Sequence, residues 1–236
     1  VTLSNWFSAS ENQRINKIVD KNGDEYSIRD EITRYNMYGT DATTTLNLTR
    51  GSVNYYANDV NDRIYLNSSN NTVYMGDGSD TISHNVGDGS YSNNTIYCGA
   101  GDDIVYMYNT SNNNGSINNS FIYGETGNDT IALFGAQNNT LVFKTGDGND
   151  TISFTAGANA YTHTLKFTDV EFDELDFTVN PLAQANLVIK YGESDSVTLS
   201  NWFSANSNQR IDKIIDKNGD EYSIRDEITT YNMYGT

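Results

Sequence analysis

Five aspartates in the middle of the chain recur in the same local sequence. Each occupies the sixth position of a nine-residue segment that opens with a glycine-rich turn and has an aliphatic residue at its eighth position. The segments are 57–65, 75–83, 98–106, 124–132 and 145–153, and their aspartates are Asp62, Asp80, Asp103, Asp129 and Asp150. The first segment is degenerate, because Val60 replaces the glycine that the others have at position four.

The spacing of these aspartates predicts how the segments stack. They are 18, 23, 26 and 21 residues apart, which leaves room for a second, asparagine-rich half between each pair. The halves are 70–74, 93–97, 118–123 and 138–144, and their expected core residues are Val73, Ile96, Ile122 and Phe143. One coil is therefore about 18 residues of strand, turn, strand and turn. We expect the excess residues in loops around 90–92, 109–115 and 135–137.

Stacked coils would place the aspartate carboxylates beside one another. Strand side chains alternate sides, so the aliphatic residue of each segment points inward, and neighbouring coils lie about 4.8 Å apart. Two carboxylates and several main-chain carbonyls then converge, and a hard divalent cation with about six oxygen ligands relieves their repulsion. Ca²⁺ suits such all-oxygen sites, whereas His84 and His163 are isolated and form no transition-metal cluster. We expect these two histidines to have ordinary surface or loop roles.

Composition excludes several classes of protein. The net charge of −17 and the pI near 4.2 argue against nucleic acid or an anionic membrane as partner and fit carboxylates that cations neutralise. A solvated acidic surface is the alternative interpretation of this charge. Cys98 has no partner for an intrachain disulfide, and no apolar run is long enough to span a membrane. The 36% of hydrophobic residues is enough for a narrow core lined by a few apolar rows.

A second, longer repeat encloses these segments. Residues 1–40 and 197–236 are identical at 35 of 40 positions, with an offset of 196 residues. Such identity indicates a recent tandem duplication, so we interpret the chain as one full unit followed by the opening of the next. We expect residues 1–40 to be the C-terminal cap of a preceding unit. Residues 41–167 should form a calcium-binding parallel roll, and residues 168–236 a C-terminal cap that leads into the next unit.

The nine-residue segments resemble the RTX, or haemolysin-type calcium-binding, repeat G-G-x-G-x-D-x-aliphatic-x. The resemblance covers residues 57–153, and the region 194–222 resembles the segment that commonly follows such repeats. It implies an all-β fold, a right-handed parallel β-roll (a β-solenoid), with Ca²⁺ between turns stacked on one edge and the five aspartates as side-chain ligands. Main-chain oxygens would come from turn positions one, three and five, which are Met75, Asp77, Ser79, Cys98, Ala100, Asp102, Gly124, Thr126, Asn128, Thr145, Asp147 and Asn149. Asp77 and Asp147 are expected to offer carbonyls only.

The chain departs from the family in the placement of its motifs. Ordinary RTX blocks carry the motif on both edges, whereas here the good copies alternate with asparagine-rich halves. We therefore expect a single column of three or four Ca²⁺ ions, with the opposite edge free of metal. On that edge asparagine pairs would stack as an amide ladder. The pairs are Asn70 and Asn71, Asn93 and Asn94, Asn118 and Asn119, and Asn138 and Asn139.

The flanking segments are expected to form β-rich caps with a short helix. Strands at 165–167, 175–179, 187–191 and 197–199 would cover the open end of the roll, with Trp202 and Phe203 buried there. A sugar-stacking platform is the alternative role of this aromatic pair. Residues 216–221 could form an EF-hand loop, but the glycine stands at position four, and Asn218-Gly219 favours a hairpin. A helix is expected at 224–230, and the first copy of the repeat should fold alike.

These features favour a structural function. The sequence has no recognisable catalytic motif that pairs a nucleophile with a base, so we expect that the chain is not an enzyme. We predict a monomeric, calcium-rigidified extender of a giant secreted adhesin or surface-layer-like protein at the bacterial cell surface, with neighbouring tandem units as partners. The resemblance also implies type I secretion and folding on Ca²⁺ outside the cell. The alternatives are a carbohydrate-binding module with a cell-surface glycan as partner, an ice-binding surface, and the secretion and folding module of an exported RTX toxin or hydrolase.

Overall fold

The computed structural model describes residues 17–27, 34–39, 42, 45–83, 91–108, 117–134, 136–155, 163–179, 185–204, 211, 213–227 and 232–233. The chain forms two compact units, 1–35 and 36–236. Strands are the main secondary structure of the described residues in both units, and those of the second unit also include the 3₁₀ turn η2 (Phe172–Glu174) and the helix α2 (Ile224–Glu227). The all-β prediction is therefore confirmed. No helix in the described part of the chain is long and apolar enough to cross a membrane.

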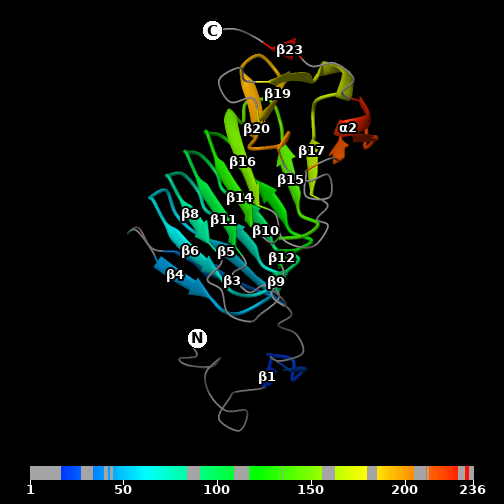
Figure 1. The fold of residues 1–236 in the computed structure, drawn as a ribbon. Coiled ribbons are helices and arrows are strands. Elements are labelled where there is room, and N and C mark those ends of the chain that lie inside the picture. Colours follow the sequence, from blue (N-terminus) through cyan, green and yellow to red (C-terminus); the bar gives the residue numbers. More distant parts are fainter. Residues whose placement is uncertain are drawn as a thin grey trace. The chain divides into compact units, whose positions relative to one another are not determined.

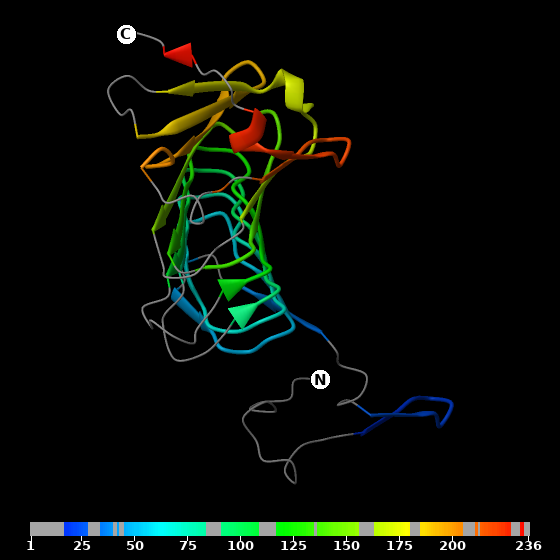
Figure 2. The ribbon, with the colours of Figure 1, turned by 45° about the vertical axis from the view of Figure 1, so that its right-hand side comes forward.

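Two parallel sheets run through the second unit and face each other across a thin core (Figures 1 and 2). The first sheet stacks β3 (Tyr35–Tyr38), β5 (Val53–Tyr56), β7 (Thr72–Tyr74), β10 (Thr95–Tyr97), β13 (Phe121–Tyr123), β15 (Thr140–Phe143) and β17 (Thr164–Phe167). The second stacks β4 (Thr45–Leu48), β6 (Arg63–Leu66), β8 (Thr81–Ser83), β11 (Ile104–Tyr108), β14 (Thr130–Phe134) and β16 (Asn149–Thr155). The chain alternates between the sheets, which is the predicted parallel β-roll.

The core consists of in-register rows of apolar side chains. In the second sheet one row is Ile64, Ile82, Val105, Ile131, Ile152 and Leu199. In the first sheet the matching row is Tyr55, Val73, Ile96, Ile122, Leu141, Leu165 and Ile214. All of these side chains are at most 2% exposed, so two narrow rows provide much of the buried apolar surface. Leu141, and not the expected Phe143, continues the row, while Phe143 is buried beside Phe167.

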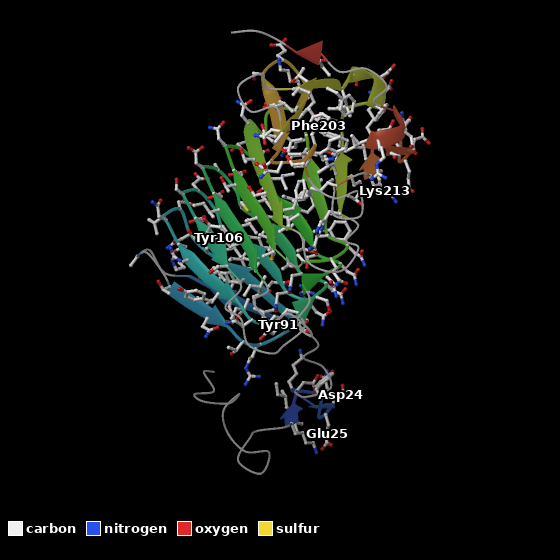
Figure 3. The ribbon with its side chains drawn as sticks, in the orientation of Figure 1. Asp24, Glu25, Tyr91, Tyr106, Phe203 and Lys213 are labelled. Atoms are coloured by element: carbon white, nitrogen blue, oxygen red, sulfur yellow. The ribbon has the colours of Figure 1, made fainter. Side chains whose placement is uncertain are left out.

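Antiparallel strands cover the C-terminal end of the roll, as predicted. β18 (Asp176–Val179), β19 (Leu187–Tyr191) and β20 (Asp195–Leu199) extend the second sheet, and β23 (Asn232–Met233) pairs with β18. Trp202 is 4% exposed and its indole N–H donates to the Ile211 carbonyl at 2.7 Å. Phe203 packs edge-on against Trp202, with ring centroids 5.0 Å apart (Figure 3). Burial, and not a sugar platform, is therefore the role of Trp202.

Residues 216–221 form a hairpin turn, as the sequence favoured. β21 (Lys213–Ile215) pairs with β22 (Glu221–Ser223), and β21 also pairs with β17 at the end of the first sheet. Asp216 is 3% exposed, and its Oδ1 accepts hydrogen bonds from the backbone N–H groups of Asn218 and Asp220 at 2.9 and 3.0 Å. This carboxylate stabilises the turn itself, so an EF-hand is not formed. Helix α2 follows, and the remainder of its predicted span, 228–230, lies outside the described residues.

The first unit contains the equivalent hairpin. β1 (Lys17–Val19) and β2 (Glu25–Ser27) form a two-stranded antiparallel sheet with the same register as β21 and β22. Asp20 accepts from the N–H groups of Asn22 and Asp24, as Asp216 does in the second copy. The prediction that the first copy folds alike is thus confirmed for residues 17–27.

The predicted insertion loops are described only in part. Residue 90, residues 109–115 and residue 135 lie outside the described ranges. Tyr91–Ser92 forms β9, which pairs in parallel with β12 (Ile117–Asn118), and Asn118 makes a bridge with Gln137. The ends of the insertions therefore form a small strand stack of their own beside the asparagine-rich turns.

Candidate metal centre

The five repeat aspartates form one column along an edge of the roll. The first four each immediately precede a strand of the second sheet, whereas Asp150 is the second residue of β16. Asp80, Asp103, Asp129 and Asp150 are each 1% exposed. The Oδ1 atom of each of these four accepts a hydrogen bond from the backbone N–H of the aspartate one coil earlier. The N···O distances are 2.6, 2.6, 2.8 and 2.9 Å from Asp62, Asp80, Asp103 and Asp129 respectively. The carboxylates are thus held in line by the backbone of the neighbouring coil.

The second carboxylate oxygen in this column is buried and unsatisfied. The Oδ2 atoms of Asp80, Asp103, Asp129 and Asp150 have no hydrogen-bond partner among the residues that the structure describes. A buried anionic oxygen without a partner is costly, because the protein replaces neither its hydration nor its counter-ion. A hard divalent cation that prefers oxygen ligands coordinates this oxygen in place of water and neutralises its charge. This donor set therefore fits Ca²⁺.

Burial changes the proton affinity of these carboxylates. Desolvation is the largest cause, and it raises the pKa of Asp103 and Asp150 to about 8, of Asp129 to about 7 and of Asp80 to about 6. The backbone hydrogen bond to each carboxylate lowers its pKa, and neighbouring acidic groups raise it further. Without a cation, the column therefore holds protons near neutral pH.

The glycine-rich turns stack too closely for side chains. Positions two and four have positive φ in all four good copies, with Glu125 at φ 67° as the non-glycine exception. In the second turn, a Cβ added to Gly99 would lie 1.8 Å from the Gly76 carbonyl oxygen, and one on Gly101 would lie 1.9 Å from that of Gly78. Glycine is required here by the contact between coils as well as by its own backbone conformation.

Main-chain oxygens of these turns link the coils. The position-three carbonyls of Ala100, Thr126 and Asp147 each accept a hydrogen bond at 2.8 Å from the position-four N–H of the preceding turn. These are predicted calcium ligands, and each carbonyl oxygen retains a second lone pair. Within the described ranges, no three acidic, histidine or cysteine side chains converge on one point. A cation at this edge would therefore combine one or two carboxylates with main-chain oxygens, as the sequence led us to expect.

The other predicted site residues differ in exposure. At position one, Met75, Cys98 and Gly124 are buried, whereas Thr145 is exposed. At position five, the exposed side chains of Asp102 and Asn128 accept hydrogen bonds from the backbone N–H groups of Asn128 and Asn149 at 2.8 and 3.2 Å. Ser79 and Asn149 are exposed as well, and so is Asp77 at position three. The side chains at position five thus form a second, solvent-facing row beside the buried aspartates.

Asp147 is placed differently from the expectation that it would offer only its carbonyl. Its side chain is 2% exposed, its Oδ2 accepts from the Lys144 N–H at 2.9 Å, and its Oδ1 is unsatisfied among the described residues. Burial raises the pKa of Asp147 to about 6. The Asp147 carboxylate is therefore also available as a metal ligand at this edge. Its turn is the last of the nonapeptides, so no further nonapeptide turn stacks on it.

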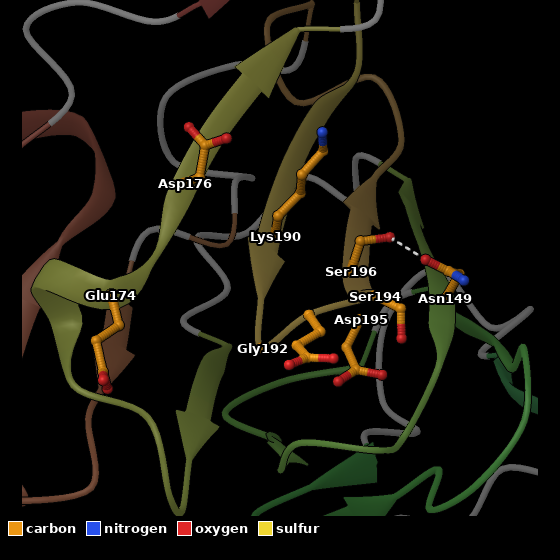
Figure 4. Close-up of a pocket in the computed structure, with 9 residues that line it drawn as sticks. Asn149, Glu174, Asp176, Lys190, Gly192, Ser194, Asp195 and Ser196 are labelled. Atoms are coloured by element: carbon orange, nitrogen blue, oxygen red, sulfur yellow. Dashed lines mark hydrogen bonds between the residues drawn. The ribbon is translucent and has the colours of Figure 1, made fainter.

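Asp195 is an edge residue that sequence reasoning missed. It is 6% exposed, and its two carboxylate oxygens accept from the N–H groups of Gly146 and Gly148 at 2.9 and 3.1 Å. The signal was present, because Asp195–Val197 reads Asp-Ser-Val where the repeats read Asp-Thr-Ile. It is shifted in register, however, since Val197 and not Asp195 lies opposite Asp150. Asp195 lines a pocket of about 380 Å³. Figure 4 shows it beside Ser196, whose hydroxyl donates to the side-chain oxygen of Asn149 at 2.8 Å.

Two buried tyrosine hydroxyls were also missed. Tyr55 and Tyr191 are 2% and 1% exposed, and neither hydroxyl has a hydrogen-bond partner in the described part of the chain. Burial is the first cause that raises the pKa of each, followed by Asp62 and Asp80 for Tyr55 and by Asp150 and Asp147 for Tyr191. These hydroxyls therefore belong to the surroundings of the aspartate column, one at each end.

The asparagine edge has the predicted ladder. The side-chain oxygens of Asn71, Asn94, Ser120 and Asn139 each accept from the backbone one coil earlier, at 2.9 to 3.2 Å. The Asn94 amide also donates to the Ser68 carbonyl at 3.1 Å. The residues before them, Asn70, Asn93, Asn119 and Asn138, have φ between 52 and 63°. The third pair is thus Asn119 and Ser120, one residue later than predicted.

His163 ends this ladder, so the expectation of an ordinary surface or loop role was wrong for it. Its Nδ1 accepts from the Asn139 N–H at 3.3 Å, and it is 3% exposed. Burial lowers the pKa of His163 to about 4, so the ring is neutral at pH 7 and can accept this bond. His84 lies outside the described residues.

Comparison with known proteins agrees with this geometry. Four matches to the RTX calcium-binding nonapeptide repeat cover residues 56–82, 83–106, 114–141 and 142–160. The haemolysin-type calcium binding protein related domain matches residues 186–219. No curated protein matched the chain. A crystal structure of the extracellular lipase LipA from Serratia marcescens matched with 15% identity and a TM-score of 0.23, over 67% of this chain and 39% of that one. The chain therefore spans well under half of that protein.

RTX nonapeptide repeats bind calcium and are structural, not catalytic. The four repeat matches coincide with the four good turns of the aspartate column, and the related domain coincides with the strands that cap the roll. The chain therefore contains RTX calcium-binding nonapeptide repeats, followed by a haemolysin-type calcium-binding related domain.

Proposed function

We propose that this chain is a calcium-stabilised extender, repeated in tandem within a large secreted protein of the bacterial cell surface. The observation that carries the proposal is the set of four buried aspartates Asp80, Asp103, Asp129 and Asp150. Each has one carboxylate oxygen bonded to the backbone and one without a hydrogen-bond partner among the residues that the structure describes. RTX repeat proteins are typically exported by type I secretion, which supports a function outside the cell. The near-identical 40-residue segments, 196 residues apart, support a tandem arrangement.

Calcium would act here as a counter-charge that permits folding. Asp80, Asp103, Asp129 and Asp150 would hold three or four ions on one edge, with Asp62 and Asp147 at the ends of the column. The ion supplies positive charge and oxygen coordination, which offset the desolvation of the carboxylates. At low calcium the charge of −17 opposes compaction, so the chain would stay unfolded until it is exported. The asparagine edge needs no ion, because its side chains are neutral and hydrogen-bond to the backbone of neighbouring coils.

A glycan-binding module is the main alternative function. The surface that would bind a glycan is then the row of tyrosines on the first sheet. Tyr38, Tyr56, Tyr74, Tyr97 and Tyr123 form a row along the first sheet, with successive ring centroids 4.5 to 5.3 Å apart. The rings stack on one another, so their faces are covered and mainly their edges remain for solvent. Sugars pack on aromatic faces, and this geometry therefore favours a structural row. A module that folds an exported hydrolase would share the calcium chemistry, but tandem duplication favours an extender.

Circular dichroism during calcium titration tests the proposal. Protein stripped with a chelator should show a cooperative gain of β signal at about 10⁻⁴ to 10⁻³ M Ca²⁺, the range of extracellular modules. Mg²⁺ is the matched control, because it retains its waters and should restore far less structure. Calorimetry in parallel should give three or four ions per chain. Full β signal in excess chelator, or no calcium uptake, would count against the proposal.

A further inference from the structure

The two hairpin copies have the same internal structure. Their pairings agree residue for residue at the 196-residue offset, from Lys17 opposite Ser27 and Lys213 opposite Ser223 onward. Each has an ion pair between its strands, Lys17 with Glu25 and Lys213 with Glu221. Figure 3 labels Glu25 in the first hairpin and Lys213 in the second. The two hairpins differ in sequence only at Val19 and Ile215, so a large difference in exposure between them comes from their surroundings.

The second hairpin is docked on the roll. β21 adds to the first sheet beside β17, with Ile214 opposite Leu165, and Ile214 is 0% exposed. The ring of Tyr222 stacks on Phe172 at 4.0 Å. Lys217 donates its backbone N–H to the Val170 carbonyl at 3.0 Å, and its ammonium lies 3.1 Å from Glu171. Main-chain pairing, an apolar contact and an ion pair thus all fix this hairpin to the end of the roll.

The first hairpin exposes the equivalent residues. Ile18 and Val19 are 53% and 56% exposed, and Tyr26 is 42% exposed. These residues correspond to Ile214, Ile215 and Tyr222, which the second copy buries wholly or in part. Among the described residues β1 and β2 form a sheet of two strands, so no described strand pairs with the edge of β1 that corresponds to the edge of β21 paired with β17. The described chain has two hairpins and one C-terminal roll end, and the second hairpin occupies the first sheet at that end.

We propose that the face of the first hairpin formed by Ile18, Val19 and Tyr26 is a docking surface for the roll end of a second copy of this unit. The open edge of β1 would pair with the strand equivalent to β17, which is an addition of a strand to a sheet edge. Ile18 would cover the core row at Leu165, and Lys21 would meet the acidic residues equivalent to Glu171 and Glu174. This inference rests on the proposed tandem arrangement, in which each junction has one hairpin for one roll end.

Complex formation with a roll whose end is uncovered tests the inference. Residues 41–204 retain every parallel strand of the roll except β3 and lack both hairpins, so mixing them with the intact chain in calcium should give a one-to-one complex in sedimentation velocity. Ile18→Asp in the intact chain should abolish the complex and leave the melting temperature of that chain unchanged. Ile214→Asp is the matched substitution in the docked copy and should lower the melting temperature. A folded 41–204 chain that forms no complex would overturn the inference.

A second measurement applies if residues 41–204 do not fold alone. Residues 213–223 differ from residues 17–27 only at Ile215, which is Val19 in the first copy. The chain with Ile215→Val therefore places the sequence of the first hairpin on the roll end. Hydrogen exchange at the Ile214 amide should stay slow, within a few-fold of the unsubstituted chain, and loss of this protection would show that the first hairpin cannot dock. A lost calcium response would instead count against the proposed function, so the two failures are distinguishable.

Discussion

Aspartate and asparagine occupy equivalent positions on opposite edges of the roll, and they differ by one group. In both columns a side-chain oxygen accepts the backbone N–H of the preceding coil, as Asp103 does from Asp80 and Asn94 does from Asn71. The other terminal group of the side chain differs. In Asp103 it is an oxygen without a hydrogen-bond partner among the described residues, and in Asn94 it is an NH₂ group that donates to the Ser68 carbonyl. The same backbone geometry thus produces a cation site on one edge and a neutral ladder on the other.

Asp103→Asn should separate the ladder from the metal site. The bond from the Asp80 N–H is retained, while the unsatisfied oxygen and its charge are removed. We expect the metal-free roll to become more stable and calcium affinity to fall by about tenfold or more, because even groups behind the ligands affect metal affinity by that much. Calorimetric titration and urea unfolding in chelator measure the two effects. The matched change on the other edge, Asn94→Asp, should lower stability without added calcium, and an unchanged calcium affinity in Asp103→Asn would contradict this assignment.

At the scale of elements, the turns are set by how closely the coils approach. Gly101 has φ 132°, and a Cβ there would lie 1.9 Å from the carbonyl oxygen of Gly78. Gly219, in the hairpin turn, has φ 86° and nothing within 4 Å of an added Cβ. The first glycine is thus required by a contact as well as by its backbone angle, and the second by its angle alone.

Gly101→Ala and Gly219→Ala therefore form a matched pair. The first should lower the free energy of unfolding by about 3 kcal/mol or more, since backbone strain and overpacking each cost about 1–3 kcal/mol. The second should cost only about 1–2 kcal/mol, from the left-handed conformation. Urea unfolding in saturating calcium measures both. Equal losses in the two variants would show that contact between the stacked turns is not what requires glycine at Gly101.

The elements with strong local patterns were predictable from the sequence. The nine-residue turns, the capping strands and the hairpin at Asn218-Gly219 have turn residues at fixed places, and the structure has all of them. The errors came where alternation is ambiguous or an insertion precedes a turn. In the apolar run that includes Leu141 and Phe143, either residue could be the one in the core row. The third asparagine turn follows the longest insertion, and its ladder position is occupied by Ser120, one residue later than predicted.

The roles of Asp195 and His163 depend on tertiary structure and were not predictable in this way. Asp195 reaches the last turn from the capping strands, 47 and 49 residues away in sequence from Gly148 and Gly146. His163 replaces an asparagine at the end of the amide ladder, which no local pattern marks. Each residue completes a column of side chains at the point where the repeat ends. The sequence does not indicate which residue packs next to the final coil, so neither role could be predicted.

At the scale of the whole molecule, the aspartate column couples folding to pH as well as to calcium. The pKa values of Asp80, Asp103, Asp129 and Asp150 are raised from 3.8 to between about 6 and about 8, chiefly by burial. The folded, metal-free roll therefore binds these protons more tightly than the unfolded chain does. Linkage then makes protonation stabilising, and the stabilisation is fully present below about pH 4 and is lost as pH rises through 6 to 8.

The melting temperature in chelator should consequently fall as pH rises from about 5 to about 8. Saturating calcium should abolish this fall, because the ion binds the deprotonated carboxylates and replaces the protons that hold the column together at low pH. Calcium binding near pH 7 should also release protons, which calorimetry detects as a dependence of the binding enthalpy on the buffer. Scanning calorimetry at several pH values, with and without calcium, measures the first two effects, and Asp103→Asn should flatten the chelator profile. A metal-free melting temperature that increases over this range would mean that the buried carboxylates are stabilised as anions by the protein itself, so that calcium is not needed to fold the roll.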